Sequence, residues 1–275
     1  DSIRGGADDD NCFTGGSIIS HNEFVAGEHA QLLRLSSRSM RCPEARRVLI
    51  EHNLFRFPSP YDPVMPPFEP TFRAGLHLEA IGVTVQNNIF DLGNIARSVR
   101  LPHYGVYTVS GVELVGVAPR GDHRIFHNTI AFTTEMQEEA SADLRDLAGI
   151  FVGDNSADID IRNNLISVSS AGQGVGNIVM NESNEGAVTL AGNVRVGTSP
   201  FTEADCGDFR LDRMCSDWFT LRPNTVVGQG VTLPSIRHDI GGFCRGEMMT
   251  TPGAWAQLDE HDGDRCGSPR PIGRR

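Results

Sequence analysis

The stretch VTVQNNIF, residues 83–90, has an apolar side chain at alternate positions and then a pair of asparagines. Similar stretches recur along the chain: SIISHNEF at 17–24, RVLIEHNLF at 47–55, RIFHNTIAF at 124–132, IDIRNNLISV at 159–168 and VTLAGNVRV at 188–196. A period of two residues is that of a β-strand, whereas a helix repeats after about 3.6 residues. The chain is therefore predicted to repeat one kind of strand, each copy ending in asparagine.

The repeat is loose, with a step of roughly 30 to 40 residues, and internal repeats are typical of solenoids. A second short strand precedes most copies, at 30–35, 74–80, 111–117, 148–154 and 176–181. Two strands per repeat, with no two-residue hairpin signal between them, predict a parallel solenoid whose coils stack about 4.8 Å apart.

The recurrent asparagine has a structural explanation. We expect it at a bend of each coil, in the left-handed conformation that asparagine tolerates better than other non-glycine residues. Its side-chain amide is also expected to bond to the equivalent amide one coil further on, which gives a ladder. The members of this ladder are Asn22, Asn53, Asn88, Asn128, Asn164 and Asn193.

The repeated bends resemble the right-handed parallel β-helix repeats of the pectate-lyase-like superfamily. The resemblance covers residues 17–196, and AGN at 191–193 departs from the common [HN]-N-x-[IFV] form. It implies an all-β, right-handed parallel β-helix of about six coils over residues 1–196. It implies no single reaction, because this fold serves lyases, hydrolases, epimerases, adhesins and phage spikes.

The repeat ends near residue 197. FTLRPNTVVGQG (219–230) and HDIGGFCRGEMMTTPGAW (238–255) resemble the closing segment of bacterial surface β-helix proteins. The matching residues are Asp239, Gly242, Arg245, Gly253, Ala254 and Trp255, whereas Ala256 replaces the acidic residue of that segment. Residues 197–275 are therefore predicted to form a disulfide-tied cap that shields the edge of the last coil.

The chain has six cysteines, and none has the spacing of a zinc site. Scattered cysteines in even number predict three disulfides and an extracellular or cell-surface location, with reduced thiols in a cytosolic protein as the alternative. Although fifteen connectivities exist, spacing favours Cys206 with Cys215, Cys244 with Cys266, and Cys12 with Cys42.

Composition excludes several functions. The net charge of −11 argues against nucleic acid as the main partner. All 24 basic residues are arginine, so no mechanism can use a lysine base, a Schiff base or a P-loop lysine. No apolar run is long enough for a membrane-spanning helix. The opening DSIRGGADDD has no signal region, so we expect a mature, processed or truncated chain.

The longest insertions follow the asparagine strands, at 56–72, 91–110 and 133–147, so they are expected to form one rim of the solenoid. They would overhang the outward face of the preceding strands, where alternation places Arg34, His77, Glu79, Glu113 and Phe151. Aromatic rings stack on sugars, and arginine binds hydroxyl or uronate groups. The predicted polysaccharide-binding residues are Arg34, Tyr61, Arg97, His103, Tyr104 and Tyr107.

Whether the protein is an enzyme stays open at this point. The polygalacturonase motifs N-T-D, D-D, G-H-G and R-I-K are absent. If it is an enzyme, the candidate catalytic residues are His77, Glu79, Glu113 and Arg100, and calcium held by the two glutamates would be the cofactor of a lyase. Otherwise these are ordinary exposed side chains. His21, His52 and His127 are interpreted as bend residues rather than metal ligands, so no metal or other cofactor is expected.

The favoured function is an exported, non-catalytic β-helix that acts as a surface scaffold or binds carbohydrate. The alternative is a polysaccharide lyase or glycoside hydrolase that works in a cleft on the helix face. A third possibility is a subunit of a larger assembly such as a filament or tail spike.

Overall fold

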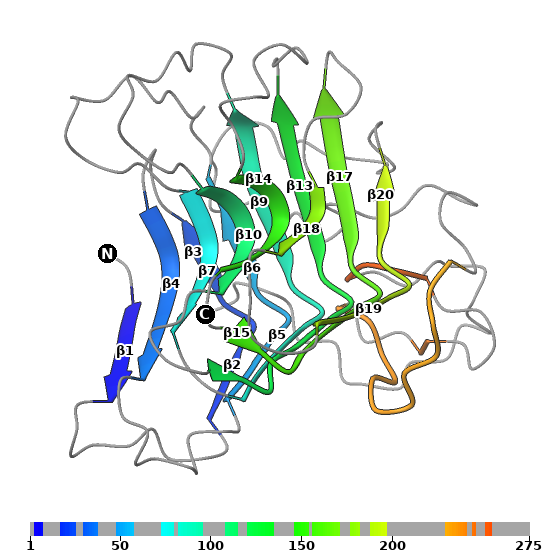
Figure 1. Ribbon diagram of the computed structural model, residues 1–275, viewed down its shortest axis with the longest axis horizontal. Helices are drawn as coiled ribbons and strands as arrows, with labels where there is room; N and C mark the ends of the chain where they lie inside the picture. The colour runs from blue at the N-terminus through cyan, green and yellow to red at the C-terminus, as the bar shows by residue number, and fades with distance from the viewer. Residues whose placement is uncertain are drawn as a thin grey trace.

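The computed structural model describes residues 3–7, 17–25, 30–37, 48–57, 73–79, 82–95, 108–114, 120–134, 146–153, 156–170, 177–181, 188–196, 229–240, 244–245 and 251–254. These residues form strands, bends and turns but no helix. The strands pair in parallel and build three six-stranded sheets, named here sheets A, B and C (Figure 1). The all-β, parallel character predicted from the repeats is confirmed.

The chain visits the three sheets in turn and then returns to the first. Sheet A contains β1 (Ile3–Ala7), β4 (Ala30–Ser37), β7 (Arg73–Glu79), β10 (Thr108–Leu114), β14 (Asp146–Val152) and β18 (Asn177–Asn181). Sheet B contains β2 (Ile18–Ser20), β5 (Val48–Glu51), β8 (Val83–Gln86), β12 (Arg124–Phe126), β16 (Ile159–Arg162) and β19 (Val188–Ala191). Sheet C contains β3 (Glu23–Val25), β6 (Leu54–Arg56), β9 (Ile89–Ile95), β13 (Thr129–Thr134), β17 (Leu165–Ser170) and β20 (Val194–Val196).

A small sheet of β11 (Arg120–Gly121) and β15 (Ser156–Ala157) lies between sheets A and B in chain order. Each strand therefore pairs with its equivalents in the coils before and after it, which is the arrangement expected of a parallel β-helix.

The prediction of two strands per repeat is wrong, because each asparagine lies in the middle of its segment and not at the end. Residues 83–90, for example, contain β8 and the start of β9, with the bend at Asn87 and Asn88 between them. The third strand extends into the predicted insertions, so β9 takes up residues 91–95.

The interior consists of columns of apolar side chains in register. In sheet B the column contains Ile19, Ile50, Val85, Ile125 and Ile161, and it ends at Leu190, which is 54% exposed. In sheet C, Phe24, Phe55 and Phe90 stack with ring centroids 4.8 and 4.6 Å apart and interplanar angles of 9°. The sheet C column ends at Arg195, which is opposite Ile166. A charged residue at an inward position of an edge strand opposes pairing with a further strand.

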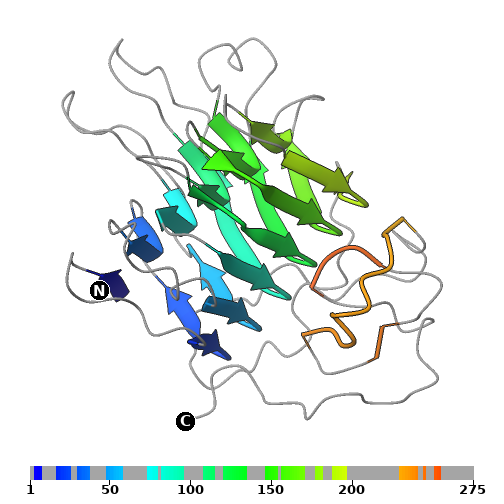
Figure 2. The same ribbon diagram turned by 60° about the horizontal axis from the view of Figure 1, so that its bottom comes forward.

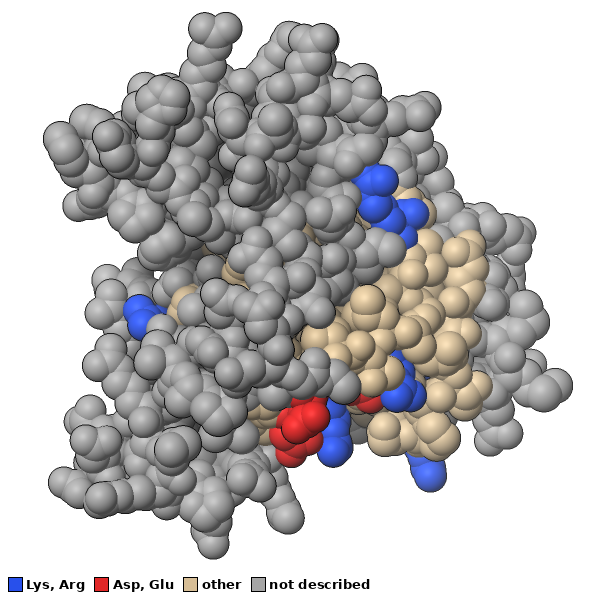
Figure 3. Space-filling view, viewed as in Figure 1, with Lys and Arg blue, Asp and Glu red and all other residues tan. Residues whose placement is uncertain are grey.

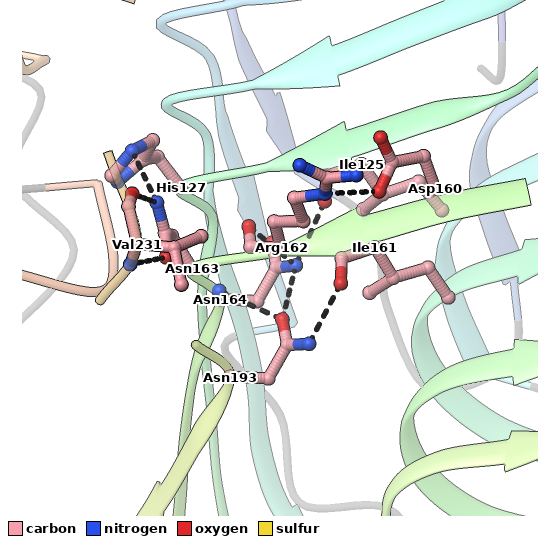
Figure 4. Close-up of polar contacts among 9 residues, drawn as sticks. All are labelled: Ile125, His127, Asp160, Ile161, Arg162, Asn163, Asn164, Asn193 and Val231. Carbon is pink, nitrogen blue, oxygen red and sulfur yellow. Dashed lines mark hydrogen bonds and ion pairs between the residues drawn. The ribbon is translucent and has the colours of Figure 1, made fainter. Parts of the chain in front are cut away.

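The six asparagines form a continuous hydrogen-bonded ladder between sheets B and C. In each coil the backbone N–H and Nδ2 of the asparagine both donate to Oδ1 of the next asparagine, at 2.9–3.1 Å. From the second member onward, Nδ2 also donates to a carbonyl of the preceding coil, as Asn88 does to Ile50 at 2.9 Å. Asn53, Asn88, Asn128 and Asn164 are completely buried. Figure 4 shows the last step of the ladder, from Asn164 to Asn193.

The left-handed conformation belongs to the residue before each ladder asparagine, and not to the asparagine itself as predicted. These residues, called here the bend column, are His21, His52, Asn87, His127, Asn163 and Gly192, with φ between 52° and 62°. The backbone bends at this residue, between a strand of sheet B and the following strand of sheet C. Glycine adopts a positive φ without steric cost, and asparagine and histidine occur with a positive φ more often than most other residues.

The described residues of the C-terminal segment (229–240, 244–245 and 251–254), called here the strap, lie along the bend column. Figures 1 and 2 show the strap, in orange and red, beside one flank of the stacked strands. Its hydrogen bonds to the coils join Val231 to Asn163, His238 to Asn87, Arg245 to Asn87, Gly253 to Asn163, and Ala254 to Thr129. Whether other residues of 197–275 shield the last coil stays a prediction, because they lie outside the described part of the chain.

Candidate binding face

The outward face of sheet A carries a row of side chains that come from successive coils. Register pairs Arg34 with His77, His77 with Glu113, and Glu113 with Phe151. The residues on either side of each row member, such as Leu33, Leu35, Leu76 and Leu78, belong to the apolar core. Because side chains alternate along a strand, the row faces away from the core, with about 4.8 Å between neighbouring strands.

The row is only partly accessible. Arg34 is half-buried, whereas His77 and Phe151 have exposed fractions of 5% and 6%. These two side chains point outward and are nevertheless buried, so the face is covered at its middle. A ligand that reaches His77 must therefore bind beneath whatever covers it or displace it.

Three glycines accompany the row at the same level of neighbouring strands. Gly75, Gly111 and Gly149 each precede a row residue by two positions and so lie on the same face. They leave backbone without side chains beside His77, Glu113 and Phe151, and Gly75 and Gly149 are buried there like His77 and Phe151. The sequence signal for these glycines is the recurrence of AGL, SGV and AGI at 74–76, 110–112 and 148–150.

The two candidate glutamates do not occupy equivalent positions. Glu113 is opposite His77, whereas Glu79 is opposite Ser36 and lies two residues further along its strand. The two residues are thus at different register positions of sheet A. The histidine and Glu113 form the pair that register brings directly together.

The remaining predicted ligand residues lie outside the described part of the chain. They are Tyr61, Arg97, Arg100, His103, Tyr104 and Tyr107. Their roles in binding or catalysis stay predictions, as do those of the sheet A row.

The space-filling view in Figure 3 shows one face of the molecule with its described charges. Basic and acidic residues are scattered among uncharged ones on that face and do not gather into a patch of one sign. Two arginines of sheet B pair with acids of their own coil, the exposed Arg124 with Asp122 at 3.7 Å and the half-buried Arg162 with Asp160 at 2.6 Å. These arginines are already engaged locally, in contrast to a cluster aimed at one anionic ligand.

Two histidines of the bend column, His52 and His127, are buried, and His21 is half-buried. His52 lies 5.1 Å from His21 and 5.2 Å from His238, measured between ring centroids. Within the described ranges no group of three His, Cys, Asp or Glu residues is arranged to hold a metal ion. Burial, with the charges of His238, His21 and Arg245, lowers the pKa of His52 from 6.5 to about 3.

His127 is shifted in the same direction. Its exposed fraction is zero, and burial followed by the charge of Arg245 lowers its pKa well below 6.5, although backbone hydrogen bonds to Gly253 and Thr251 act the other way. Both histidines are therefore neutral at physiological pH.

The contacts between bend column and strap were not anticipated from the sequence. A usable signal is present, because each residue before a ladder asparagine is His, Asn or Gly, the types that tolerate a positive φ.

Cys244 is the one cysteine within the described ranges, and it is disulfide-bonded. Its partner lies outside those ranges, so the predicted pairing stays a prediction. No helix in the described part of the chain is long and apolar enough to cross a membrane. Comparison with protein-family models, curated proteins and solved structures finds no match for the chain.

Proposed function

We propose that the protein is an exported, non-catalytic parallel β-helix that binds a carbohydrate chain across the outward face of sheet A. We also propose that the helix is right-handed and of the pectate-lyase-like kind, with about six coils and a disulfide-tied C-terminal segment. The observation that supports binding at this place is the row Arg34–His77–Glu113–Phe151, in which one residue from each of four successive strands lies opposite the next in the strand register.

The row has the chemistry that an extended saccharide needs. Arginine donates several hydrogen bonds to carboxylate or hydroxyl oxygens, and histidine and glutamate add further polar groups. Phe151 is 6% exposed, so its ring offers a stacking surface only to a ligand that displaces what covers it. Because the glycines beside the row have no side chain, sugar rings that displace the cover of this face can lie close to the backbone. The arrangement favours a chain that runs across the strands, with successive sugars on successive coils.

The test is binding of the intact protein to an array of uronate-containing and neutral glycans. We expect Arg34→Ala to weaken the binding of an acidic glycan by about 10- to 100-fold, since a hydrogen bond to a charged group contributes about 1.5–3 kcal/mol. Arg124→Ala is the matched control, because Arg124 is an exposed arginine on sheet B. Equal losses in the two variants, or no binding by the unaltered protein, would contradict the proposal.

A second function is favoured by one specific observation, the direct opposition of His77 and Glu113 on neighbouring strands. A histidine and a carboxylate side by side are suited to general acid–base chemistry. Incubation with the same glycans, with and without calcium, should then yield unsaturated products or new reducing ends, and Glu113→Gln should abolish them. Turnover that depends on Glu113 would replace the binding proposal with a lyase or hydrolase.

A further inference from the structure

The strap is held on the coils by two copies of the same three-part arrangement. In each copy a histidine of the bend column lies one coil before an asparagine, and that asparagine binds the strap with both ends of its amide. The first copy is His52 with Asn87, and the second is His127 with Asn163. The two copies are two coils apart and use different parts of the strap.

In the second copy, the hydrogen bonds fix which way the Asn163 amide points. Its Oδ1 accepts from the N–H of Val231 at 2.7 Å, and its Nδ2 donates to the carbonyl of Val231 at 2.6 Å (Figure 4). The same Nδ2 faces Nε2 of His127 at 3.0 Å. Because an amide nitrogen only donates, Nε2 of His127 has to accept, and this is possible only for the neutral ring.

In the first copy, hydrogen bonds fix the orientation of the Asn87 amide in the same way. Oδ1 of Asn87 accepts from Nη2 of Arg245 at 2.9 Å, and its Nδ2 donates to the carbonyl of His238 at 3.1 Å. Nδ2 also faces Nε2 of His52 at 3.5 Å. A proton on that nitrogen would place two donors opposite each other.

Charges near the two imidazoles also disfavour a proton. Arg245 is buried and donates to the carbonyls of Thr251, Gly253 and Ala254 as well as to Asn87. It lowers the pKa of both His52 and His127, and His52 has in addition two imidazole neighbours, His21 and His238. No carboxylate contributes to either shift; the strap's own Asp239 is fully buried, and its Arg237 is exposed.

We propose that the strap is an acid-sensitive latch, which detaches from the bend column when His52 and His127 take up protons while the coils themselves stay folded. The strap supplies Arg245, His238, Thr251 and Gly253 to the surroundings of the two rings, so its departure opens them to water. The asparagine ladder and the apolar columns contain no group that titrates in this range, and they hold the coils together independently of pH.

The size of the effect follows from linkage. In the detached form each ring regains at most the ordinary histidine pKa of about 6.5, since His21 stays beside His52 on the coils, and in the docked form it stays neutral. One pH unit below that value, each histidine therefore favours the detached form by up to about tenfold, and the two together by up to about a hundredfold. Above pH 7.5 the contribution to release vanishes.

The test is hydrogen exchange of single amides in the full chain at pH 7.5 and 5.5, corrected for the intrinsic effect of pH. The amides of Val231, Gly253 and Ala254 report docking, because each donates to a residue of the coils. The amides of Asn88 and Asn128 report the ladder. We expect protection of the strap amides to fall by up to about a hundredfold relative to the ladder amides at pH 5.5.

The decisive variant is His52→Asn with His127→Asn. Asparagine occupies the equivalent position in other coils at Asn87 and Asn163, so the fold tolerates it there. We expect this double variant to lose the fall in protection, and His77→Gln, which changes a buried histidine on sheet A, to keep it. Equal strap protection at the two pH values in the unaltered protein would overturn the proposal. Joint loss of strap and ladder protection, or an unchanged fall in the double variant, would overturn it as well.

Discussion

The ladder and the bend column are adjacent in sequence at every coil, yet they differ in what they tolerate. The ladder consists of asparagine in all six coils, whereas the bend column contains three histidines, two asparagines and one glycine. The ladder side chain must both donate to and accept from buried partners in neighbouring coils, which few residues besides asparagine can do. The bend residue must only adopt a positive φ and face the strap. The ladder position therefore accepts asparagine alone in these coils, whereas the bend position accepts several residue types.

The largest expected effect is that of Asn88→Leu. Leucine would leave the backbone N–H of Asn53 without its acceptor and would remove the side-chain donor to the carbonyl of Ile50. It would also remove one of the two donors to Oδ1 of Asn128, the backbone N–H of residue 88 being the other. Each buried group left unsatisfied costs about 1–3 kcal/mol, so the free energy of unfolding should fall by several kcal/mol in chemical denaturation. Asn22→Leu is the control, because Asn22 is exposed and has ladder bonds on one side only. Similar losses in both variants would show that burial of the ladder does not matter.

Lowering the pH should destabilise the folded protein through His52 of the bend column, whereas the ladder has no side chain that titrates in this range. Because the folded-state pKa of His52 is lowered to about 3, the unfolded state takes up the proton first as pH falls below 6.5. Stability from this residue is complete above pH 6.5 and is lost between pH 6.5 and 3. Between pH 7.5 and 5 the loss should reach up to about 2 kcal/mol.

The corresponding measurement is the urea midpoint across this pH range, with His52→Asn as the comparison. That variant should lose less stability in acid than the unaltered protein does. A pH dependence that is the same with and without the imidazole would remove His52 from the account.

A smaller effect is expected when the shape of the bend residue changes. His127→Val puts a β-branched residue at a φ of 52°, which should cost about 1–2 kcal/mol, while His127→Gly avoids that strain. Thermal unfolding of the two variants separates strain from loss of the imidazole, which they share. If the glycine variant is as unstable as the valine variant, backbone conformation is not what limits this position.

The smallest effect on the coils is expected from a change in the strap. Gly253 packs against Thr129 and Leu165, and a Cβ there would lie 2.9 Å from Oγ1 of Thr129, at a φ of 99°. Gly253→Ala is therefore expected to loosen the strap, with faster exchange of the Ala254 amide and little change in circular dichroism of the strands. A loss of strand signal in this variant would mean that strap and coils fold as one unit.

More of the coils than of the strap could be predicted from the sequence. Alternation and a recurrent asparagine are local patterns, so the all-β parallel class, the six ladder positions and the outward alternation of Arg34, His77 and Phe151 can be read from short windows. The third strand was missed because the bend interrupts each apolar run after only three or four residues. The positive φ was assigned one residue too late, since histidine before asparagine carries a weaker signal than asparagine itself.

The strap could not be placed from sequence for a different reason. Its contacts join residues up to 158 positions apart, as between Asn87 and Arg245, and no local pattern relates two such positions. The candidate binding face could be predicted from the sequence only in part. Register explains why Arg34, His77 and Glu113 share one row, but what covers His77 depends on contacts that alternation cannot predict.

The central claim is that the order of the coils depends on the ladder and not on the strap, which is held by side chains of the bend column. Amide hydrogen exchange at pH 7.5 of Arg245→Gln beside Asn88→Leu tests it most directly. Arg245→Gln removes four hydrogen bonds inside and beneath the strap, whereas Asn88→Leu breaks the ladder. The account predicts that Arg245→Gln exposes the amides of Val231, Gly253 and Ala254 while those of Asn88 and Asn128 stay protected, and that Asn88→Leu weakens protection throughout. Loss of ladder protection in Arg245→Gln, to the same extent as in Asn88→Leu, would contradict it.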